Sequence, residues 1–499
     1  MWIKLDGNGP LFRQLYRALR AGIVDGVVPP GARLPATRAL ASELGLSRTT
    51  VLLAYEQLAA EGYLDGKRGS GSFVQASLAP APTRAKAAAP VRLGTVSATV
   101  APPRLSPFGV FLTDGRSRPI FSSYVSGRPR LPYDFRYGAP SLHDFPVQIW
   151  QRCLGRRARR ASAPFFDYGH PQGSTALRAA LAGYLLRGRG VRCEPDQIQI
   201  VGGSQQGLDL AARLLLAPDD VAVVEEPGYE GARRAFLAAG ARLALVPTDA
   251  EGIDVEALAR LGRRARLAHV TPSHQYPLGG VMPYPRRVAM LEWAARTGAY
   301  LIEDDYDGEY RFGGRPLDAL KALDDGERVI YLGTLSKVMF PALRIGYLVL
   351  PSSLVEPFAR AKLLADGGSA FLEQEALADF IANGAFERHV RRSRSWNGER
   401  RAALLRALDT HFGTRVTVVG ANAGLHVVAW FHGLSPRHAR ELVQRAAALG
   451  VGVYPVTPYY EAPPATLGLL LGYGALQVRS ITTGIARLAE AAQGFGPNR

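Results

Sequence analysis

The 499-residue sequence predicts a mixed α/β protein with a small, mainly helical N-terminal domain and a large domain built on a mainly parallel sheet. Three observations lead to this fold class. Residues 1–77 space their apolar side chains at the helix period, residues 78–118 are rich in Pro and Ala, and from residue 130 onward short apolar runs alternate with helical patterns. Such alternation implies a mainly parallel sheet covered on both faces. We therefore expect domains at 1–77 and 119–499, joined by a semi-extended basic linker at 78–118.

The composition excludes several classes of protein. The apolar fraction of 47% and the charged fraction of 21% are those of a folded chain rather than a disordered one. Two cysteines are too few for a disulfide scaffold or a cysteine metal cluster, and we predict no metal site. No apolar stretch approaches the roughly 20 residues that span a bilayer, and the first residues lack the apolar core of a signal peptide. We expect a cytoplasmic protein with no membrane partner.

The net charge of +17 favours a polyanionic partner. An Arg-rich composition by itself also produces such a charge, so the charge leaves both explanations open. Residues 79–130 hold eight Lys or Arg against one acidic residue, which makes the basic excess densest in the linker region rather than in the N-terminal domain.

The N-terminal domain begins with two predicted helices. Leu11, Leu15, Leu19 and Ile23 recur at intervals of four, which marks one helix face, and Pro29-Pro30-Gly31 ends that helix. A second helix is expected at Thr37–Leu44. It stops at Gly45, which can adopt the left-handed cap conformation.

A third helix follows after a tight turn, and together the two short helices form a helix-turn-helix pattern. Ser47 is a good N-cap for this helix, which we expect to end near Gly62. Its first turn, Ser47-Arg48-Thr49-Thr50, can grip phosphate through free amides and hydroxyls, and Arg48 can reach guanine edges in the major groove. Its rear face is expected in the core: Val51, Leu52, Tyr55 and Leu58.

A basic hairpin comes next. Two short apolar edges within Tyr63–Val74 flank a tip that holds Lys67, Arg68 and Gly69. Gly69 and Gly71 permit close approach of the backbone, and the two cations can contact phosphate or the minor groove. We interpret this hairpin as a wing beside the helix-turn-helix.

Residues 10–74 resemble the winged helix of the GntR family of bacterial repressors. The motifs that match, in order, are Pro30-Gly-Ala-Arg33-Leu-Pro35-Ala-Thr-Arg38, Leu46-Ser-Arg-Thr-Thr50, Leu58-Ala-Ala-Glu-Gly62 and Gly69-Ser-Gly71. The resemblance implies that the partner is a double-stranded DNA operator. It also implies DNA contacts from Arg38, Arg48 and Thr50, with the wing at Gly69.

Six apolar runs of the large domain are expected to be strands. They are Gln197–Val201, Val221–Val224, Leu243–Val246, Ala299–Ile302, Arg328–Tyr331 and Gly346–Leu350. The strongest chemical signal lies where two of them end, because strand ends in such sheets carry ligand sites. Glu303-Asp-Asp-Tyr-Asp307 follows one strand, Lys337 stands 31 residues beyond Tyr306, and Arg344 lies seven residues further.

This set of residues predicts a pyridoxal phosphate site. Such a site needs a carboxylate against the pyridine nitrogen, a lysine for the Schiff base, and cationic and hydroxyl groups for the phosphate. Lys337 in a confined site can lose its proton and form the Schiff base. Asp304 is our choice for the ring-nitrogen partner, although spacing alone leaves Glu303 and Asp305 open. Thr334, Ser336 and Arg344 can hold phosphate oxygens.

Residues 130–495 also resemble fold-type I aminotransferases. Tyr168-Gly-His-Pro-Gln-Gly173-Ser-Thr-Ala-Leu-Arg178 matches their early signature, and Val201-Gly-Gly-Ser-Gln-Gln-Gly207 matches the turn that cradles the phosphate. The resemblance implies phosphate contacts from Gly203, Ser204 and Gln205. Glu226-Pro-Gly-Tyr229 implies that Tyr229 stacks on the cofactor. Tyr168 would reach the phosphate of the neighbouring subunit, which implies a homodimer with shared sites.

Two departures from the aminotransferase pattern matter. Tyr276, in His274-Gln-Tyr-Pro-Leu-Gly279, replaces the Asn that normally bonds the ring oxygen, and Tyr306 is the candidate to supply that contact instead. Residues 461–478 contain no Arg, whereas aminotransferases usually keep one near this segment for the substrate α-carboxylate. Arg479 and Arg315 are the unplaced candidates for another cation that binds an effector.

A winged helix, a Pro-rich linker and an aminotransferase-like domain in this order resemble the MocR subfamily of GntR regulators. The resemblance implies a transcription regulator, not an enzyme, that binds pyridoxal 5'-phosphate at Lys337 as a Schiff base. Promoter binding would change when the cofactor alone, or the cofactor with an amine or amino acid, is bound. A residual transaminase half-reaction is compatible with this function. The alternative is a working aminotransferase with an appended N-terminal module.

Overall fold

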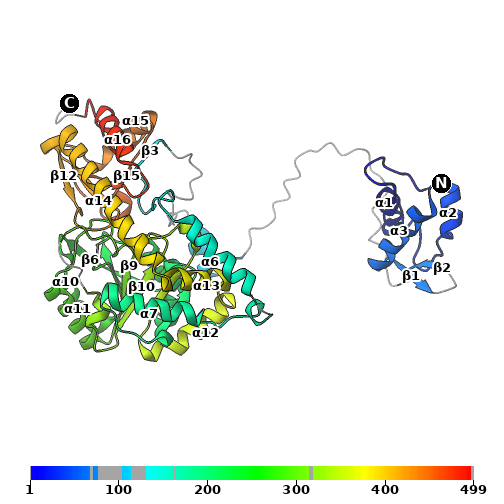
Figure 1. Cartoon of the computed structure of the whole chain (residues 1–499), viewed down its shortest axis with the longest axis horizontal. Coiled ribbons are helices and arrows are strands. Elements are labelled where there is room, and N and C mark those ends of the chain that lie inside the picture. Colours follow the sequence, from blue (N-terminus) through cyan, green and yellow to red (C-terminus); the bar gives the residue numbers. More distant parts are fainter. Residues whose placement is uncertain are drawn as a thin grey trace. The chain divides into compact units, whose positions relative to one another are not determined.

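The structure, a computed structural model, describes residues 2–67, 71–76, 104–113, 131–161, 163–313 and 318–495. The chain forms two compact units, Met1–Pro103 and Arg104–Arg499 (Figure 1). The division falls within the range predicted as the linker, and residues 78–103 of that range lie outside the described residues.

The N-terminal unit is the predicted winged helix-turn-helix. It comprises α1 (Leu11–Val24), α2 (Thr37–Leu44), α3 (Arg48–Ala60) and an antiparallel hairpin of β1 (Leu64–Lys67) and β2 (Gly71–Val74). Gly45 ends α2 with a φ of 66°, so the predicted left-handed cap is confirmed. The hairpin confirms the wing, although Arg68, Gly69 and the side chain of Lys67 lie outside the described part of the chain.

One predicted core residue of α3 is wrong. Val51, Tyr55 and Leu58 are buried as expected, but Leu52 is 41% exposed. Buried positions on a helix recur at intervals of three or four residues, and Leu52 lies about 100° around the helix from Val51. Hydrophobicity alone therefore misplaced it.

A short helix, α4 (Pro107–Thr113), lies in the range predicted as a semi-extended linker. Ser106 Oγ accepts a hydrogen bond from the amide of Gly109 (3.2 Å), and none of the helix residues is buried. The expectation of an extended path is wrong here because the helix keeps its one proline at the first position, where a helix tolerates it, and an apolar run at 108–112 follows.

An eight-stranded sheet organises the large unit, in the order β4-β11-β10-β9-β8-β5-β6-β7. The pairs from β10 through β9, β8 and β5 to β6 are parallel, whereas β11 and β7 pair antiparallel with their neighbours. The strands are β4 (Ile198–Val201), β5 (Val221–Glu226), β6 (Arg242–Asp249), β7 (Gly252–Ile253), β8 (Ala265–Val270), β9 (Tyr300–Asp305), β10 (Val329–Thr334) and β11 (Gly346–Val349). The mainly parallel sheet and all six predicted strands are confirmed, and β7 and β8 are additional.

Helices cover both faces of this sheet (Figure 1). They are α6 (Val147–Arg160), α7 (Thr175–Arg189), α8 (Ser204–Leu215), α9 (Glu230–Ala238), α10 (Val255–Ala259), α11 (Tyr284–Thr297), α12 (Val355–Asp366) and α13 (Phe371–Ala382). Alternate residues of a strand serve the two faces. Ile302 packs with residues of α8 and α9, whereas Leu301 packs with residues of α11.

The C-terminal part builds a second, antiparallel sheet in the order β12-β13-β16-β15, accompanied by α14 (Ala385–Phe412), α15 (Ala439–Ala448) and α16 (Val478–Ala491). Its strands are β12 (Val416–Val419), β13 (His426–Phe431), β15 (Tyr454–Pro455) and β16 (Leu467–Gly472). A short strand from the start of the large unit, β3 (Tyr133–Asp134), pairs with β14 (Val451–Gly452). This pairing brings the segment that follows β3 back onto the second sheet.

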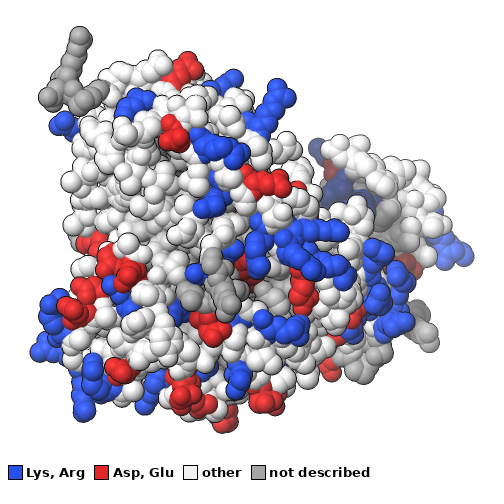
Figure 2. All heavy atoms as spheres, turned by 60° about the vertical axis from the view of Figure 1, so that its left-hand side comes forward, with Lys and Arg blue, Asp and Glu red and all other residues white. Residues whose placement is uncertain are grey.

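The basic side chains are not spread evenly over the chain. On the face drawn in Figure 2, Lys and Arg side chains gather in groups.

Within the described residues, no helix combines the length and the apolar character that crossing a membrane requires.

Candidate functional site

Lys337 follows β10 at the carboxyl end of the parallel strands. Its Nζ donates a hydrogen bond to the carbonyl oxygen of Gly138 (3.1 Å) and lies 5.2 Å from the ring centroid of Tyr137. Burial lowers the pKa of Lys337 to about 8, although the carboxylates of Asp307 and Asp304 act in the opposite direction. A lysine with such a pKa is partly neutral near pH 7.5, so it can attack an aldehyde.

Asp304 lies at the end of β9, opposite Leu332 of β10. Its Oδ2 lies 3.2 Å from Nε2 of His269, which β8 supplies. Its Oδ1 is buried and has no hydrogen-bond partner among the described residues. A buried carboxylate oxygen without a donor is costly, so this atom fits a ligand N–H such as that of a protonated pyridine.

The neighbouring carboxylates face other partners. Glu303 accepts hydrogen bonds from the amides of Leu320 (2.7 Å) and Lys321 (2.8 Å). Asp305 Oδ2 forms an ion pair with Arg189 and accepts a hydrogen bond from the hydroxyl of Tyr331, each at 2.6 Å. Because side chains alternate along a strand, both point away from the face that Asp304 presents.

The residues predicted to bind the phosphate lie close together at the N-terminus of α8. Gly203 is the N-cap, with a φ of 102°, and a Cβ there would lie 2.9 Å from Nη2 of Arg344. Arg344 donates to the carbonyl oxygen of Gly202 (2.6 Å), and Thr334 lies opposite Gly346, whose missing Cβ would be 3.0 Å from Gly203. The helix start, the hydroxyl and the guanidinium therefore converge, which is an arrangement that binds anions.

The other residues predicted at the phosphate and ring are distributed around this point. Ser204 is the first residue of α8, and the amide of Ser336 donates to Thr334 Oγ1 (3.3 Å). Gln205 Nε2 donates to the carbonyl oxygen of Gly231 (3.0 Å). A Cβ on Gly231 would lie 2.4 Å from both Gln205 Oε1 and the Tyr229 ring, so these two side chains lie side by side. The centroid of the Tyr229 ring lies 6.3 Å from that of His269, and His269 is the residue that contacts Asp304.

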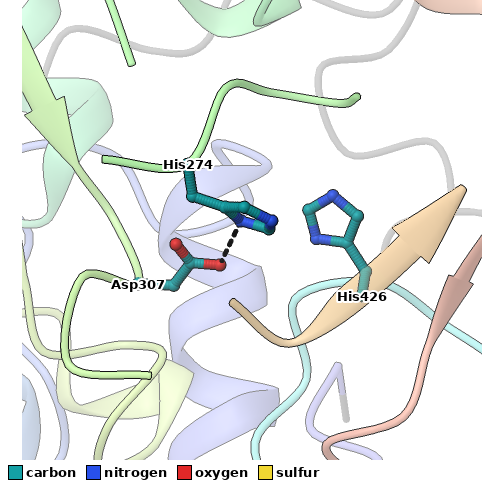
Figure 3. Close-up of side chains that lie close together, drawn as sticks. All are labelled: His274, Asp307 and His426. Carbon is teal, nitrogen blue, oxygen red and sulfur yellow. Dashed lines mark hydrogen bonds and ion pairs between the residues drawn. The ribbon is translucent and has the colours of Figure 1, made fainter. Parts of the chain in front are cut away.

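A buried polar cluster lies beside Lys337. His274 Nδ1 is 3.1 Å from Asp307 Oδ2, and the hydroxyl of Tyr306 donates to the carbonyl oxygen of His274 (2.9 Å). Figure 3 shows the ring of His426, from β13, facing the ring of His274. His274, Asp307 and His426 offer ligand atoms within 4.8 Å of one another. Tyr306 thus engages His274 in this structure.

His426 is neutral at physiological pH, because burial lowers its pKa well below the usual value. Its Nε2 contacts the carbonyl oxygen of Pro277 (2.9 Å), which can only accept, so the proton is on Nε2. Its Nδ1 is a buried acceptor with no donor among the described side chains.

An aromatic wall closes this region. Tyr276 and Tyr306 pack in one cluster with Val428, Val456 and Leu470. Tyr276, which stands in place of the expected Asn, has its ring 5.1 Å from that of Tyr459. Burial raises the pKa of Tyr306 well above its ordinary value, so its hydroxyl keeps its proton.

The two arginines suggested as effector cations are not brought to this site. Arg479 is exposed in the first turn of α16, and Arg315 lies outside the described residues. Arg136 borders the aromatic cluster instead: it pairs with Asp134 (3.2 Å) and its Nε lies 3.4 Å from the hydroxyl of Tyr454.

Tyr168 is 92% exposed in its own chain, and its backbone amide donates a hydrogen bond to Oδ1 of Asp167 (2.7 Å). The nearby Phe166 is 78% exposed. The prediction that Tyr168 serves a neighbouring subunit stays a prediction.

In the N-terminal unit, the predicted DNA-binding residues whose side chains the structure describes lie in α2 and at the start of α3. Ser47 caps α3 by accepting a hydrogen bond from the amide of Thr50 (3.1 Å), and its hydroxyl lies 2.8 Å from that of Thr50. Arg38, Arg48 and Thr49 are exposed. Within the described residues no carboxylate pairs with Arg38 or Arg48, so both guanidinium groups are available to phosphates or bases.

Several residues of the site escaped the sequence analysis. His269, His426 and Tyr137 come from β8, β13 and the segment after β3, which are distant in sequence from Lys337. Asp307 and His274 were inside the quoted motifs but received no role. The clustering of Glu303 to Asp307 at one strand end was the signal that could have identified Asp307.

Comparison with known proteins agrees with this architecture. Residues 144–465 match the family Aminotransferase class I and II, and residues 11–74 match the family Bacterial regulatory proteins, gntR family. Two solved aminotransferase structures are similar to the chain. Kynurenine aminotransferase of Pyrococcus horikoshii is 29% identical with a TM-score of 0.67, covering 73% of this chain and 91% of that one. LysN, the α-aminoadipate aminotransferase of Thermus thermophilus, is 31% identical with a TM-score of 0.66, covering 73% and 92%.

Relatives that cover nearly the whole chain are regulators. The chain is 38% identical over 488 residues to the probable rhizopine catabolism regulatory protein MocR of Rhizobium meliloti, covering 97% of this chain and 94% of that protein. It is 32% identical to the HTH-type pyridoxine biosynthesis transcriptional regulator PdxR of Corynebacterium glutamicum, covering 96% and 95%. The alternative of a working aminotransferase is therefore set aside. The chain belongs to the MocR-type members of the GntR family of transcriptional regulators, in which an aminotransferase-like domain serves a regulator rather than an enzyme.

Proposed function

We propose that this regulator binds pyridoxal 5'-phosphate through Lys337 and that occupancy of the site changes its binding to promoter DNA. The observation that carries the proposal is that a lysine of lowered pKa lies within the electrostatic influence of Asp304, whose buried Oδ1 has no hydrogen-bond donor among the described residues. A lysine and a carboxylate are the two groups that the aldehyde and the ring nitrogen of this cofactor require.

The remaining residues fit the cofactor as follows. Gly203, Ser204, Gln205, Thr334, Ser336 and Arg344 would hold the phosphate, and Tyr229 would cover the ring. Tyr306 would meet the ring oxygen if its hydroxyl turned from the carbonyl oxygen of His274. When bound, the cofactor supplies an electron-withdrawing ring and an aldehyde that condenses with amines. The chain's own groups would orient the cofactor, exclude water and hold its ring nitrogen protonated.

The effector is either the cofactor itself or an amine or amino acid that joins it. The printed names of two relatives point in these two directions, one to pyridoxine biosynthesis and one to rhizopine catabolism. An effector that carries a carboxylate needs a cation near the aromatic cluster, and Arg136, held by Asp134 and close to Tyr454, is suitably placed. A cofactor sensor needs no such cation.

We further propose that the chain acts as a homodimer whose subunits share their sites. The support is the 92% exposure of Tyr168 in a motif that serves the neighbouring subunit in aminotransferases. Two DNA-reading units in one dimer would bind two half-sites, and a change in the dimer would alter their spacing.

The test begins with an operator selected from random duplexes by the full-length protein. Operator affinity is then measured with and without pyridoxal phosphate, for the wild type and for Lys337→Ala. The proposal expects visible absorbance from the wild type plus cofactor, a shift of at least about threefold in operator affinity, and neither effect in Lys337→Ala. The proposal would be overturned if the wild-type protein stayed colourless with added cofactor, or if saturating cofactor left its operator affinity unchanged. Matched amines with and without a carboxylate then distinguish the effector classes.

A further inference from the structure

A cavity of about 430 Å³ lies apart from Lys337. It is formed by the last turn of α7, the segment after β9 and the first turns of α14, and it includes none of the residues proposed to hold the cofactor. Its volume is in the range of cavities that bind small molecules.

Arginines dominate the lining of this cavity, and part of their charge is neutralised. Arg187 pairs with Glu387 (2.8 Å), and Arg189 pairs with Asp305 (2.6 Å). The two arginines of these ion pairs therefore add little net charge to the cavity.

Three further guanidinium groups have no carboxylate partner among the described residues. Nε of Arg311 donates to the carbonyl oxygen of Gly313, and Nε of Arg394 to that of Glu309, both at 2.8 Å. Arg391 is exposed on α14 and lines the same cavity. Backbone carbonyls satisfy hydrogen bonds without cancelling charge, so the lining remains cationic.

Two shifts in pKa are consistent with this excess of positive charge. Burial and the neighbouring Arg189 lower the pKa of Arg311. Burial and Asp305 raise the pKa of Glu309 to about 7, so this acid carries only part of a negative charge at neutral pH. A bound anion would relieve the crowding of like charges.

We propose that this cavity binds a small polyanion that carries two or more phosphate or carboxylate groups. Guanidinium groups from different elements converge on one concave site, and each can bind such a group through two parallel hydrogen bonds. A solvated Arg-rich surface explains isolated arginines on a convex helix face, but it does not explain their convergence on a cavity. Since Arg189 contacts Asp305 and Asp304 faces the proposed cofactor, the two sites use opposite faces of β9.

Isothermal titration of the full-length chain with inorganic pyrophosphate and, separately, with citrate tests the proposal at an ionic strength of about 0.15 M. We expect saturable binding of one anion per chain, with and without saturating pyridoxal phosphate. Arg391→Gln should weaken it about tenfold. Arg392→Gln is the matched control, because Arg392 is exposed on the same helix but does not line the cavity, and it should leave the affinity unchanged. The stronger of the two ligands identifies phosphate or carboxylate as the preferred group.

Three outcomes would overturn the proposal. The first is the absence of saturable binding by both anions. The second is equal weakening by Arg391→Gln and Arg392→Gln, which would indicate a general charge effect. The third is binding that Arg344→Gln removes and Arg391→Gln leaves intact, which would assign the anion to the proposed cofactor site. If the first outcome is accompanied by loss of duplex DNA binding in Arg391→Gln, the arginines belong to a nucleic-acid surface instead.

Discussion

His269 Nε2 lies 3.2 Å from one carboxylate oxygen of Asp304, while the other oxygen of Asp304 is buried with no donor among the described residues. One oxygen is thus held by the protein, and the carboxylate also acts electrostatically on Lys337. A buried carboxylate oxygen without a donor fits a ligand that brings a positively charged N–H.

Asp304→Asn should weaken retention of pyridoxal phosphate by about ten- to a hundredfold, because an amide cannot stabilise a protonated ring nitrogen as a carboxylate does. The affinity is measured by titrating cofactor into the apoprotein and following visible absorbance. Asp209→Asn, which removes an exposed carboxylate on α8, is the control. Equal affinities for both variants would contradict the assigned role.

The rate at which the apoprotein captures the cofactor covalently should depend on pH. Because burial lowers the pKa of Lys337 to about 8, the reactive neutral amine increases as the pH rises through 8 and changes little above it. Stopped-flow absorbance between about pH 6.5 and 9.5 should therefore rise and then level off. A rate that still climbs steeply above pH 9 would mean that the lysine keeps an ordinary pKa.

Asp307→Ala should reduce the stability of the large unit. The change leaves the buried His274 without the carboxylate that lies 3.1 Å from its Nδ1, and leaving a buried polar group without its hydrogen-bond partner typically costs about 1–3 kcal/mol. Thermal unfolding of the apoprotein measures the effect, with Asp307→Asn as the milder variant because it keeps a hydrogen-bonding oxygen. Unchanged unfolding of Asp307→Ala would show that the pair contributes nothing.

Arg48→Ala should weaken operator binding by about 1–3 kcal/mol and relax the preference at one base position, because Arg48 is exposed in the first turn of α3 and carries no carboxylate partner among the described residues. Binding is compared on the selected operator and on single-base variants of it. Arg13→Ala, on the exposed surface of α1, is the control. A uniform loss across all sequences would instead make Arg48 a phosphate contact.

Local patterns in the sequence were sufficient for the elements that carry motifs. The sequence within a few dozen residues predicts the helix that Ser47 caps. It also predicts β9, which carries Asp304, and β10, which precedes Lys337. Selection of Asp304 over Glu303 and Asp305 required the structure, because only the strand's orientation shows which carboxylate faces the site.

Tertiary contacts supplied what the sequence could not. His426, in β13, lies after Lys337 in the sequence, whereas Gly138, which accepts a hydrogen bond from Lys337, lies near the start of the large unit. No local period or spacing connects such residues. The exposed Leu52 shows the converse limit, since an apolar residue is buried only if its helix face is the one that packs.

If the subunits share their sites, mixing two variants that are each defective in cofactor binding should restore one cofactor site in each mixed dimer. Tyr168→Phe removes the hydroxyl that would reach the partner's phosphate, and Lys337→Ala removes the covalent anchor, so each homodimer has two defective sites. In a mixed dimer, the intact lysine of one chain faces the intact tyrosine of the other, while the remaining site has both defects. Tyr168 is 92% exposed and therefore free to act outside its own chain. Visible absorbance at limiting cofactor, measured after the two variants are unfolded and refolded together, should exceed the average of the separate samples. An absorbance equal to that average would place Tyr168 outside the site and remove the main argument for a shared dimer.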